Sequence, residues 1–563
     1  MIYHCEDHTC NYWDEGEKLP ERCPQCGRKL LRANEADMTG DDWTALGNTL
    51  WYAEASDKKR MVDCFRKAAY LGSAWGVCNL GICMEQGNGV EADPVQAFWL
   101  YQQAVEMGSL NAVCCLGVCY QYGIGTAPDA EKAAELYCKA AEYGSPRGQM
   151  LLARAFHDGI GVEADAAEAV HWVRAAAYQR YGEGMYRLGV CYEYGDGVEQ
   201  NWEHAVHWFR EAAESGVSVA MTDLGYCYEK GCGVEQSWEQ AFSWYRRGAE
   251  CGYPVSMSNL GLCYKRGYGV EQNWQEAIKW YEQGAQCGDL QSMHNLACCY
   301  ERGEGVEQNE DRALYWYRRG AEAGSDYCMY CLGWNYSNGE GVEQNMTEAI
   351  RWYTAAAEGG NADAMHDLGW HYDHGEGVEQ DMKKAICWYE RAAEQNHPAA
   401  MNSLGECYAM GRGVPRDLET AMEWYRRAAE LGEAMADYNM GWHLEQAGKL
   451  SEAYAHYRKA ADGNDDSAWW ALGRFYENGV VVAQDGKEAR RCYETGEKLG
   501  SVKCKMRLAR CKLLGIGGRR EKKAGLDLCR QALELAKESS EKEDYGYEAE
   551  MNLLRRTIAE NES

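Results

Sequence analysis

The chain has 563 residues, of which 46% are hydrophobic, and its 88 acidic and 58 basic side chains give a net charge of −30. This charge repels nucleic acid phosphates and anionic lipid, so it argues against both as partners and favours basic or neutral proteins. The N-terminus has no secretory pattern, and no run approaches 18 uninterrupted apolar residues. We therefore expect a soluble cytoplasmic protein without a membrane span, whose 27 cysteines are mostly reduced.

Residues 1–37 precede the rest of the pattern and hold four cysteines in two pairs. One pair stands in CPQCG, where thiolates two residues apart, with proline before the turn and glycine after it, are typical of a knuckle around a tetrahedral ion. The segment resembles a zinc ribbon or rubredoxin-type module, which implies a structural zinc ion. The predicted ligands are Cys5, Cys10, Cys23 and Cys26.

The first cysteine pair departs from the usual spacing of such a module. It stands in CEDHTC, so His4 or His8 could replace a cysteine as a ligand. Zinc is the expected ion, with iron and unliganded thiols as the alternatives. About thirty residues cannot form a stable core unaided, whereas zinc binding of roughly 10 kcal/mol can hold such a fold. Four protein ligands leave no open coordination position, so we expect a structural cap.

A Leu-Gly pair, or its equivalent, recurs through residues 38–540 every 36 residues, with one interval of 34 and one of 32. A fixed period of this length is typical of solenoid proteins. The leucine of the pair is called the marker, and repeat positions are counted from it. The fourteen markers are Leu46, Leu80, Leu116, Leu152, Leu188, Leu224, Leu260, Leu296, Leu332, Leu368, Leu404, Met440, Leu472 and Leu508.

Each repeat predicts two helices. In residues 216–252, Ala220, Leu224 and Tyr228 fall on one face, which predicts helix A, and Gly231 can take the left-handed conformation that ends it. Helix B follows with alternating large and small apolar residues. Neither helix can bury its apolar stripe alone, so the pairs must stack on one another. The sequence therefore predicts an all-α fold, an α-solenoid of about fourteen helix pairs.

Residues that cap helices predict where helix B begins. They stand thirteen residues after ten of the markers, and their side-chain oxygens can accept hydrogen bonds from free N–H groups. Asn273 with Glu276, and Ser237 with Gln240, also have the spacing of a capping box. The predicted caps are Asp93, Asp129, Asp165, Asn201, Ser237, Asn273, Asn309, Asn345, Asp381 and Asp417.

The ordered elements Leu-Gly-x-x-Tyr, Gly-x-Gly-Val, Trp-Tyr and Ala-Ala resemble Sel1-like repeats, relatives of tetratricopeptide repeats with a longer interhelix loop. The resemblance covers about nine-tenths of the chain and implies a right-handed superhelix. Eight repeats carry cysteine three residues after the marker, which indicates a packing position rather than a ligand or nucleophile. Residues 541–563 predict a helix that caps the last pair.

The resemblance implies an intracellular scaffold or adaptor that binds a peptide or protein in the solenoid groove, and not an enzyme. One alternative is a hydrolase of the β-lactam-hydrolysing type linked to some relatives, but no G-x-S-x-G, S-x-x-K or H-E-x-x-H motif stands in a suitable context. Another is a regulator that binds nucleic acid through the zinc module. Residues 1–37 contain eight acidic and five basic side chains, which argues against it.

The resemblance also places a binding surface. In related tetratricopeptide arrays, residues two before, two after and six after the marker on helix A point into the groove. Aromatic side chains with polar tips provide large contact area at low entropic cost, so aromatic residues there predict a peptide-binding stripe. The alternative is that they pack against helix A of the next repeat. The predicted stripe is Tyr330, Trp334, His366, Trp370, His374, Tyr438 and Trp442.

Overall fold

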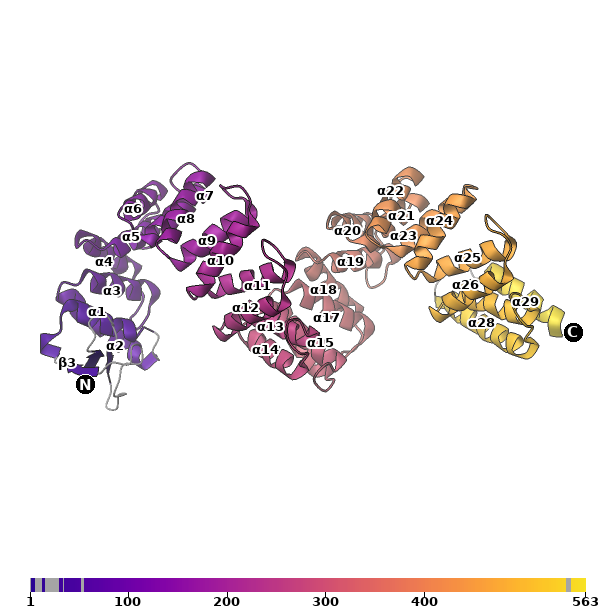
Figure 1. Cartoon of the computed structure of the whole chain (residues 1–563), viewed down its shortest axis with the longest axis horizontal. Helices are drawn as coiled ribbons and strands as arrows, with labels where there is room; N and C mark the ends of the chain where they lie inside the picture. The colour runs from indigo at the N-terminus through magenta and orange to yellow at the C-terminus, as the bar shows by residue number, and fades with distance from the viewer. Residues whose placement is uncertain are drawn as a thin grey trace. The chain divides into compact units, whose positions relative to one another are not determined.

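The structure is a computed structural model that describes residues 2–5, 13–15, 30–33, 35–51, 55–542 and 548–562. The described segments form three short strands, one 3-10 helix and 29 α-helices, with the strands confined to the N-terminus (Figure 1). Tertiary contacts divide the chain into two compact units, unit 1 at residues 1–292 and unit 2 at residues 293–563. The predicted helical repeat architecture is therefore confirmed.

The three strands form one antiparallel sheet. β1 (Ile2–Cys5) lies in the centre and pairs with β2 (Trp13–Glu15) on one side and β3 (Leu30–Ala33) on the other. The 3-10 helix η1 (Glu35–Asp37) follows and leads into the first α-helix.

Most of the predicted zinc ligands lie outside the residues that the structure describes. Cys5 is the last residue of β1, whereas Cys10, Cys23 and Cys26 lie outside the described residues, as does His8. In the part of the chain that is described, no group of three or more His, Cys, Asp or Glu side chains could hold a metal ion. A zinc ribbon is thus not part of the described fold.

Fourteen helix pairs follow the sheet in sequence. The A helices are α1 (Gly40–Thr49), α3 (Ala74–Gln86), α5 (Leu110–Tyr122), α7 (Pro146–Asp158), α9 (Gly182–Tyr194), α11 (Ser218–Lys230), α13 (Pro254–Arg266), α15 (Leu290–Arg302), α17 (Asp326–Asn338), α19 (Ala362–His374), α21 (Pro398–Met410), α23 (Ala434–Gln446), α25 (Asp466–Asn478) and α27 (Val502–Leu514).

The B helices alternate with them along the chain. They are α2 (Ala55–Tyr70), α4 (Pro94–Glu106), α6 (Ala130–Glu142), α8 (Ala166–Tyr178), α10 (Trp202–Glu214), α12 (Trp238–Glu250), α14 (Trp274–Gln286), α16 (Glu310–Glu322), α18 (Met346–Glu358), α20 (Met382–Glu394), α22 (Leu418–Glu430), α24 (Leu450–Asp462), α26 (Gly486–Lys498) and α28 (Lys522–Lys542). The two helices of a pair pack against each other from α1 with α2 to α13 with α14, and from α17 with α18 to α27 with α28.

The predicted caps begin the B helices α4 to α22. Asn273 Oδ1, for example, accepts a hydrogen bond from the backbone N–H of Glu276 at 3.1 Å. The predicted capping box is wrong in its second half, because the N–H of Asn273 donates to the carbonyl of Tyr264 in helix A at 2.9 Å. The Glu276 carboxylate accepts from Lys279 Nζ instead, at 3.2 Å.

A buried tyrosine of helix B explains the glycine that follows the marker. A Cβ atom on Gly225 would lie 2.6 Å from a ring carbon of Tyr245, which is too short for any side chain to replace the hydrogen. The same contact recurs between Gly369 and Tyr389 at 2.7 Å. Tyr245 donates its hydroxyl proton to Glu229, five residues after the marker, at 2.9 Å, so the buried hydroxyl is satisfied. The Leu-Gly signature is therefore a packing requirement.

Residues that face each other between neighbouring helix pairs have complementary sizes. Helix B has Gly320 where helix A of the next pair has Cys328, and a Cβ on Gly320 would lie 2.4 Å from the cysteine Sγ. In another repeat the sizes are exchanged, since Ala140 of helix B faces Gly148 of helix A. In both cases one of the two facing residues is glycine, which lets helices of adjacent pairs approach closely at this point.

The recurrent cysteines three residues after the marker are packing residues, as predicted. All lie on A helices, and seven of the eight are buried, with Cys191 half-buried. Burial raises the pKa of Cys227 and Cys263 to about 12, so their thiols stay protonated at neutral pH.

The helix α29 (Glu548–Glu562) follows the last pair and packs against α27 and α28. Its Met551 and Leu554 are buried in one cluster with Met506 and Leu513 of α27. This helix lies within the predicted capping segment, residues 541–563, and covers apolar surface that no further repeat would bury.

Candidate functional site

Some residues of the predicted aromatic stripe contact neighbouring helices of the solenoid. Tyr330, two residues before its marker, donates its hydroxyl proton to Asp367 of the next A helix at 3.0 Å, and burial raises its pKa. Tyr438 holds the same position, where its ring lies 5.6 Å from that of Tyr457 and burial raises its pKa to about 12. These two tyrosines are packing residues.

His366 occupies the same repeat position and is also engaged. Its Nδ1 lies 3.0 Å from Asp367 Oδ1, and its Nε2 lies 3.5 Å from Ser403 Oγ of the next A helix. The ring stacks on His397, with centroids 5.2 Å apart. The residue two before the marker therefore joins successive repeats.

Residues two after the marker are more open to solvent. Trp334 is 46% exposed and Trp442 is 39% exposed, whereas Trp370 is half-buried. Trp370 stacks on His374, with ring centroids 4.3 Å apart, and His374 Nδ1 lies 3.0 Å from the Trp370 carbonyl oxygen. Within the predicted stripe, Trp370 and His374 are thus in direct ring contact, and Trp334 and Trp442 are the more accessible tryptophans.

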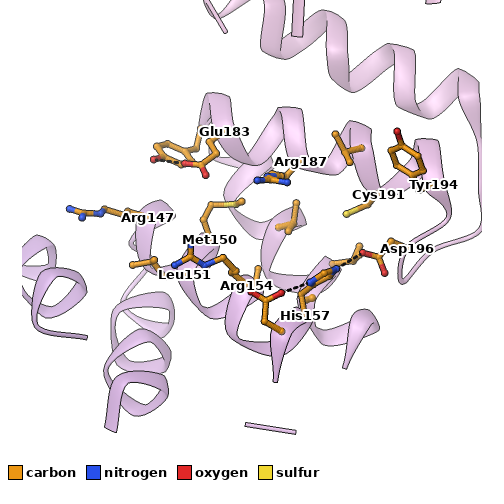
Figure 2. Close-up of a pocket in the computed structure, with 17 residues that line it drawn as sticks. Arg147, Met150, Leu151, Arg154, His157, Glu183, Arg187, Cys191, Tyr194 and Asp196 are labelled. Carbon is orange, nitrogen blue, oxygen red and sulfur yellow. Dashed lines mark hydrogen bonds and ion pairs between the residues drawn. The ribbon is translucent and has the colours of Figure 1, made fainter. Parts of the chain in front are cut away.

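Unit 1 contains a cavity of about 710 Å³ between α7, α8 and α9 (Figure 2). Apolar lining comes from all three helices, with Met150 and Leu151 on α7, Val173 on α8 and Val190 on α9. Charged side chains of α7 and α9 complete the lining, as Figure 2 shows around Met150. A site of this size, with apolar walls and a few polar groups, has the dimensions of known ligand sites.

The cavity coincides with a break in the repeat pattern. Val173 stands where most B helices have a buried tyrosine, and Ala153 stands in place of the glycine after the marker. One repeat earlier, the ring of Tyr137 fills this space, since a Cβ on Gly117 would lie 2.5 Å from it. Val173 is smaller than tyrosine, so the space that a tyrosine ring would fill beside α7 stays open and forms part of the cavity.

Three arginines of α7 and α9 line the cavity without a carboxylate partner. Arg147 donates to Asn111 Oδ1 at 3.2 Å, and Arg154 donates to the hydroxyl oxygen of Tyr122 at 3.2 Å, so both have neutral acceptors. Arg187 forms no hydrogen bond or ion pair with any described residue. The lining therefore holds three arginines outside ion pairs, beside the three carboxylates of Asp158, Glu183 and Asp196.

The carboxylates of the cavity bond to other groups. Asp158 Oδ1 lies 2.7 Å from His157 Nδ1, and Asp196 Oδ2 lies 3.2 Å from its Nε2. The hydrogen bond to Asp158 raises the pKa of His157, with Asp196 adding to the effect. Glu183 accepts a hydrogen bond from the hydroxyl of Tyr181 at 3.5 Å. The arginines are thus left available for an external anion.

Sequence reasoning missed this cavity, although one signal was present. Val173 interrupts the series of large aromatic residues on helix B, and Ala153 interrupts the Leu-Gly series in the same repeat. The two departures match each other, and such paired changes mark a repeat with different packing. That Arg154 and Arg187, 33 residues apart, line the same space follows only from the stacking of α7 and α9.

Within the described ranges, no helix is both long and apolar enough to cross a bilayer.

The stacked helix pairs define the class of protein, an α-solenoid built from two-helix repeats. The chain belongs to the Sel1 repeat family, as the motifs predicted. No curated protein matches it. The first pair, α1 and α2, precedes the thirteen segments that match the family, which are residues 76–109, 112–145, 146–181, 182–217, 218–253, 254–289, 290–325, 326–361, 362–397, 398–433, 434–465, 468–501 and 502–537.

The chain is also similar to several solved structures. The chain is 29% identical to c5321, a protective antigen of uropathogenic Escherichia coli strains with an SLR fold, over 76% of this chain and 94% of that one, with a TM-score of 0.50. It is 32% identical to a Sel1 repeat protein of Oxalobacter formigenes over 43% of this chain and 96% of that one, with a TM-score of 0.40. The immunity protein Pa5087 of Pseudomonas aeruginosa is 20% identical, over 38% and 81% of the two chains, with a TM-score of 0.30.

Proposed function

We propose that the protein is an intracellular scaffold that binds a protein or peptide on the A helices of unit 2. The observation that supports this is the exposure of Trp334 and Trp442, both two residues after a marker, on α17 and α23. Large aromatic side chains are enriched at binding hot spots because they bury much area for little entropy loss. Since the chain has a net charge of −30, a basic or aromatic-rich partner is favoured at this surface.

The experiment that tests this proposal compares capture of partners from native cell lysate by variants of the full chain. We expect Trp334→Ala with Trp442→Ala to lose proteins that the wild type retains, with a weakening of at least about 2 kcal/mol for the purified partner. Tyr315→Ala is the matched control, because Tyr315 is 53% exposed on the B helix α16 of the same unit. Equal capture by all three proteins would refute the proposal.

We also propose a structural zinc ion at the N-terminus, held by the four cysteines predicted above. The strand order supports it. Cys5 ends the central strand β1, Cys10 stands between β1 and β2 in sequence, and Cys23 and Cys26 stand between β2 and β3. Cys5 thus lies at the end of a strand and the other three cysteines lie in sequence between strands of the same small sheet, so a bound ion would tie these segments together.

Metal analysis tests the zinc proposal. Protein purified without added metal should contain one zinc ion per chain, and Cys23→Ser with Cys26→Ser should remove it. Full zinc content in that variant would rule the site out, and iron in its place would identify the alternative ion.

A further inference from the structure

Two arginine pairs occupy the same repeat positions in different parts of the chain. Arg154 stands two residues after its marker on α7, and Arg187 stands one residue before the next marker on α9. Arg474 on α25 and Arg507 on α27 hold the same two positions, again 33 residues apart. The second pair indicates what kind of group this arrangement of arginines can bind.

Three glutamates hold the C-terminal pair. Arg474 donates to Glu445 at 2.9 Å, and Arg507 donates to Glu477 at 3.3 Å and to Glu550 at 2.6 Å. Glu550 belongs to α29, which follows the last repeat, and its side chain is only 9% exposed. A carboxylate carried by a helix from outside the repeats therefore fills this position.

The cavity of unit 1 has none of these carboxylates at the equivalent positions. Gln121 stands in place of Glu445, and His157 stands in place of Glu477, each five residues after its marker. Glu550 has no counterpart between two internal repeats. The result is an arginine pair at the same repeat positions as the C-terminal one and without its acidic partners.

We propose that the cavity between α7 and α9 binds an acidic peptide segment of a partner protein, with a carboxylate placed between Arg154 and Arg187. Guanidinium groups bind carboxylates through parallel hydrogen bonds, which makes them suited to this ligand. The apolar lining at Met150 and Leu151 provides a contact for an apolar side chain beside the acidic one (Figure 2). This site is independent of the aromatic surface of unit 2.

The net charge of the chain explains why binding of an acidic peptide should depend on the arginines of the cavity. The chain as a whole repels acidic peptides because of its net charge of −30. Binding must therefore come from the arginine cluster, and it should weaken as salt screens that attraction.

A selection from a displayed library of random twelve-residue peptides tests the proposal with the full-length protein. We expect enriched peptides to carry Asp or Glu next to an apolar residue, and their affinity to fall at least tenfold in Arg154→Ala and in Arg187→Ala. The matched control is Arg180→Ala with Arg246→Ala, which removes two exposed arginines of unit 1 that pair with Glu211 and Glu250. Circular dichroism should show unchanged helix content in every variant.

A second variant separates binding from folding. His157→Glu places a carboxylate at the position that Glu477 holds beside Arg507, so it should neutralise Arg187 from within the chain. We expect loss of peptide binding with helix content and thermal stability retained. A structural role of the cavity alone would not produce this result.

Three outcomes would overturn the proposal. One is selection of peptides without acidic residues, and another is equal binding of the selected peptides by the wild type and the arginine variants. The third is failure to enrich any peptide while a single-stranded DNA oligonucleotide binds and depends on Arg154 and Arg187, which would assign the cluster to phosphate groups.

Discussion

The arginine cluster on α25 and α27 and the cavity between α7 and α9 are built from the same repeat positions, but they differ in what surrounds them. In the C-terminal cluster, Arg507 lies between Glu477 and Glu550, and its side chain is 15% exposed. In the cavity, Arg187 is exposed and has no ion pair with a described residue. Arginines thus stand at the same repeat position in both places. A few neighbouring residues decide whether the guanidinium forms ion pairs within the fold or stays free to bind a ligand.

The difference arises at two positions of the repeat. In the C-terminal cluster, Glu445 and Glu477, five residues after their markers, pair with the arginines of the next A helix. The cavity has His157 at that position, and Arg187 forms no such pair with a described residue. On helix B, Tyr493 fills the space over Gly473, whereas Val173 leaves space over Ala153. Changes of charge and of volume in one repeat therefore create an open site without altering the helices.

The largest effect is expected from Glu477→Gln. It leaves Arg507 and Arg510 without their shared carboxylate in a site where Glu477 is 11% exposed, so the free energy of unfolding of the last repeats should fall by about 3 kcal/mol. Native-state hydrogen exchange of α27 measures this. His157→Gln, at the same repeat position but with a side chain 57% exposed, should change stability by less than about 0.5 kcal/mol. Similar losses in both variants would contradict the distinction between a structural and an open cluster.

A smaller effect is expected from exchanging the residue after the marker. A Cβ on Gly473 would lie 2.2 Å from the Tyr493 ring, so Gly473→Ala should destabilise the protein by about 2 kcal/mol. Ala153→Gly, opposite the smaller Val173, should cost about 1 kcal/mol at most, through helix propensity. Denaturant titrations followed by tryptophan fluorescence compare the two. An equal response would mean that the ring contact does not require glycine.

The smallest effect concerns the first turn of the A helices. Asp465 caps α25, where burial raises its pKa to about 6, while the equivalent residue of α7 is the uncharged Ser145. The folded state favours the protonated carboxyl, so its contribution to stability falls as the pH rises from about 4 to about 6. Asp465→Asn keeps the cap and should stabilise the protein by about 1 kcal/mol at pH 7, with no gain below pH 4. Unfolding midpoints at the two pH values check this, and a gain that persists at pH 4 would exclude ionisation as its cause.

The repeat periodicity was sufficient to predict most of the fold. The spacing of Leu-Gly pairs, cap residues and loop glycines is local, because each helix begins and ends through contacts within about four residues. The stripe of Tyr330, Trp334 and their equivalents was harder to interpret. Positions two before and two after the marker lie one turn apart on the same helix, so sequence alone does not separate a contact with the next repeat from an exposed ring.

By itself, the sequence determined the helix pairs, their order and the family, because these depend on periodicity and on local hydrogen bonding. Only the tertiary structure decided which charges meet. Arg154 and Arg187 come from neighbouring repeats, and Glu550 reaches Arg507 because α29 folds back onto α27. Arg507 and Glu550 are 43 positions apart, and Arg154 and Arg187, which line one cavity, are 33 apart. Both arrangements depend on how whole helices stack rather than on any local signal.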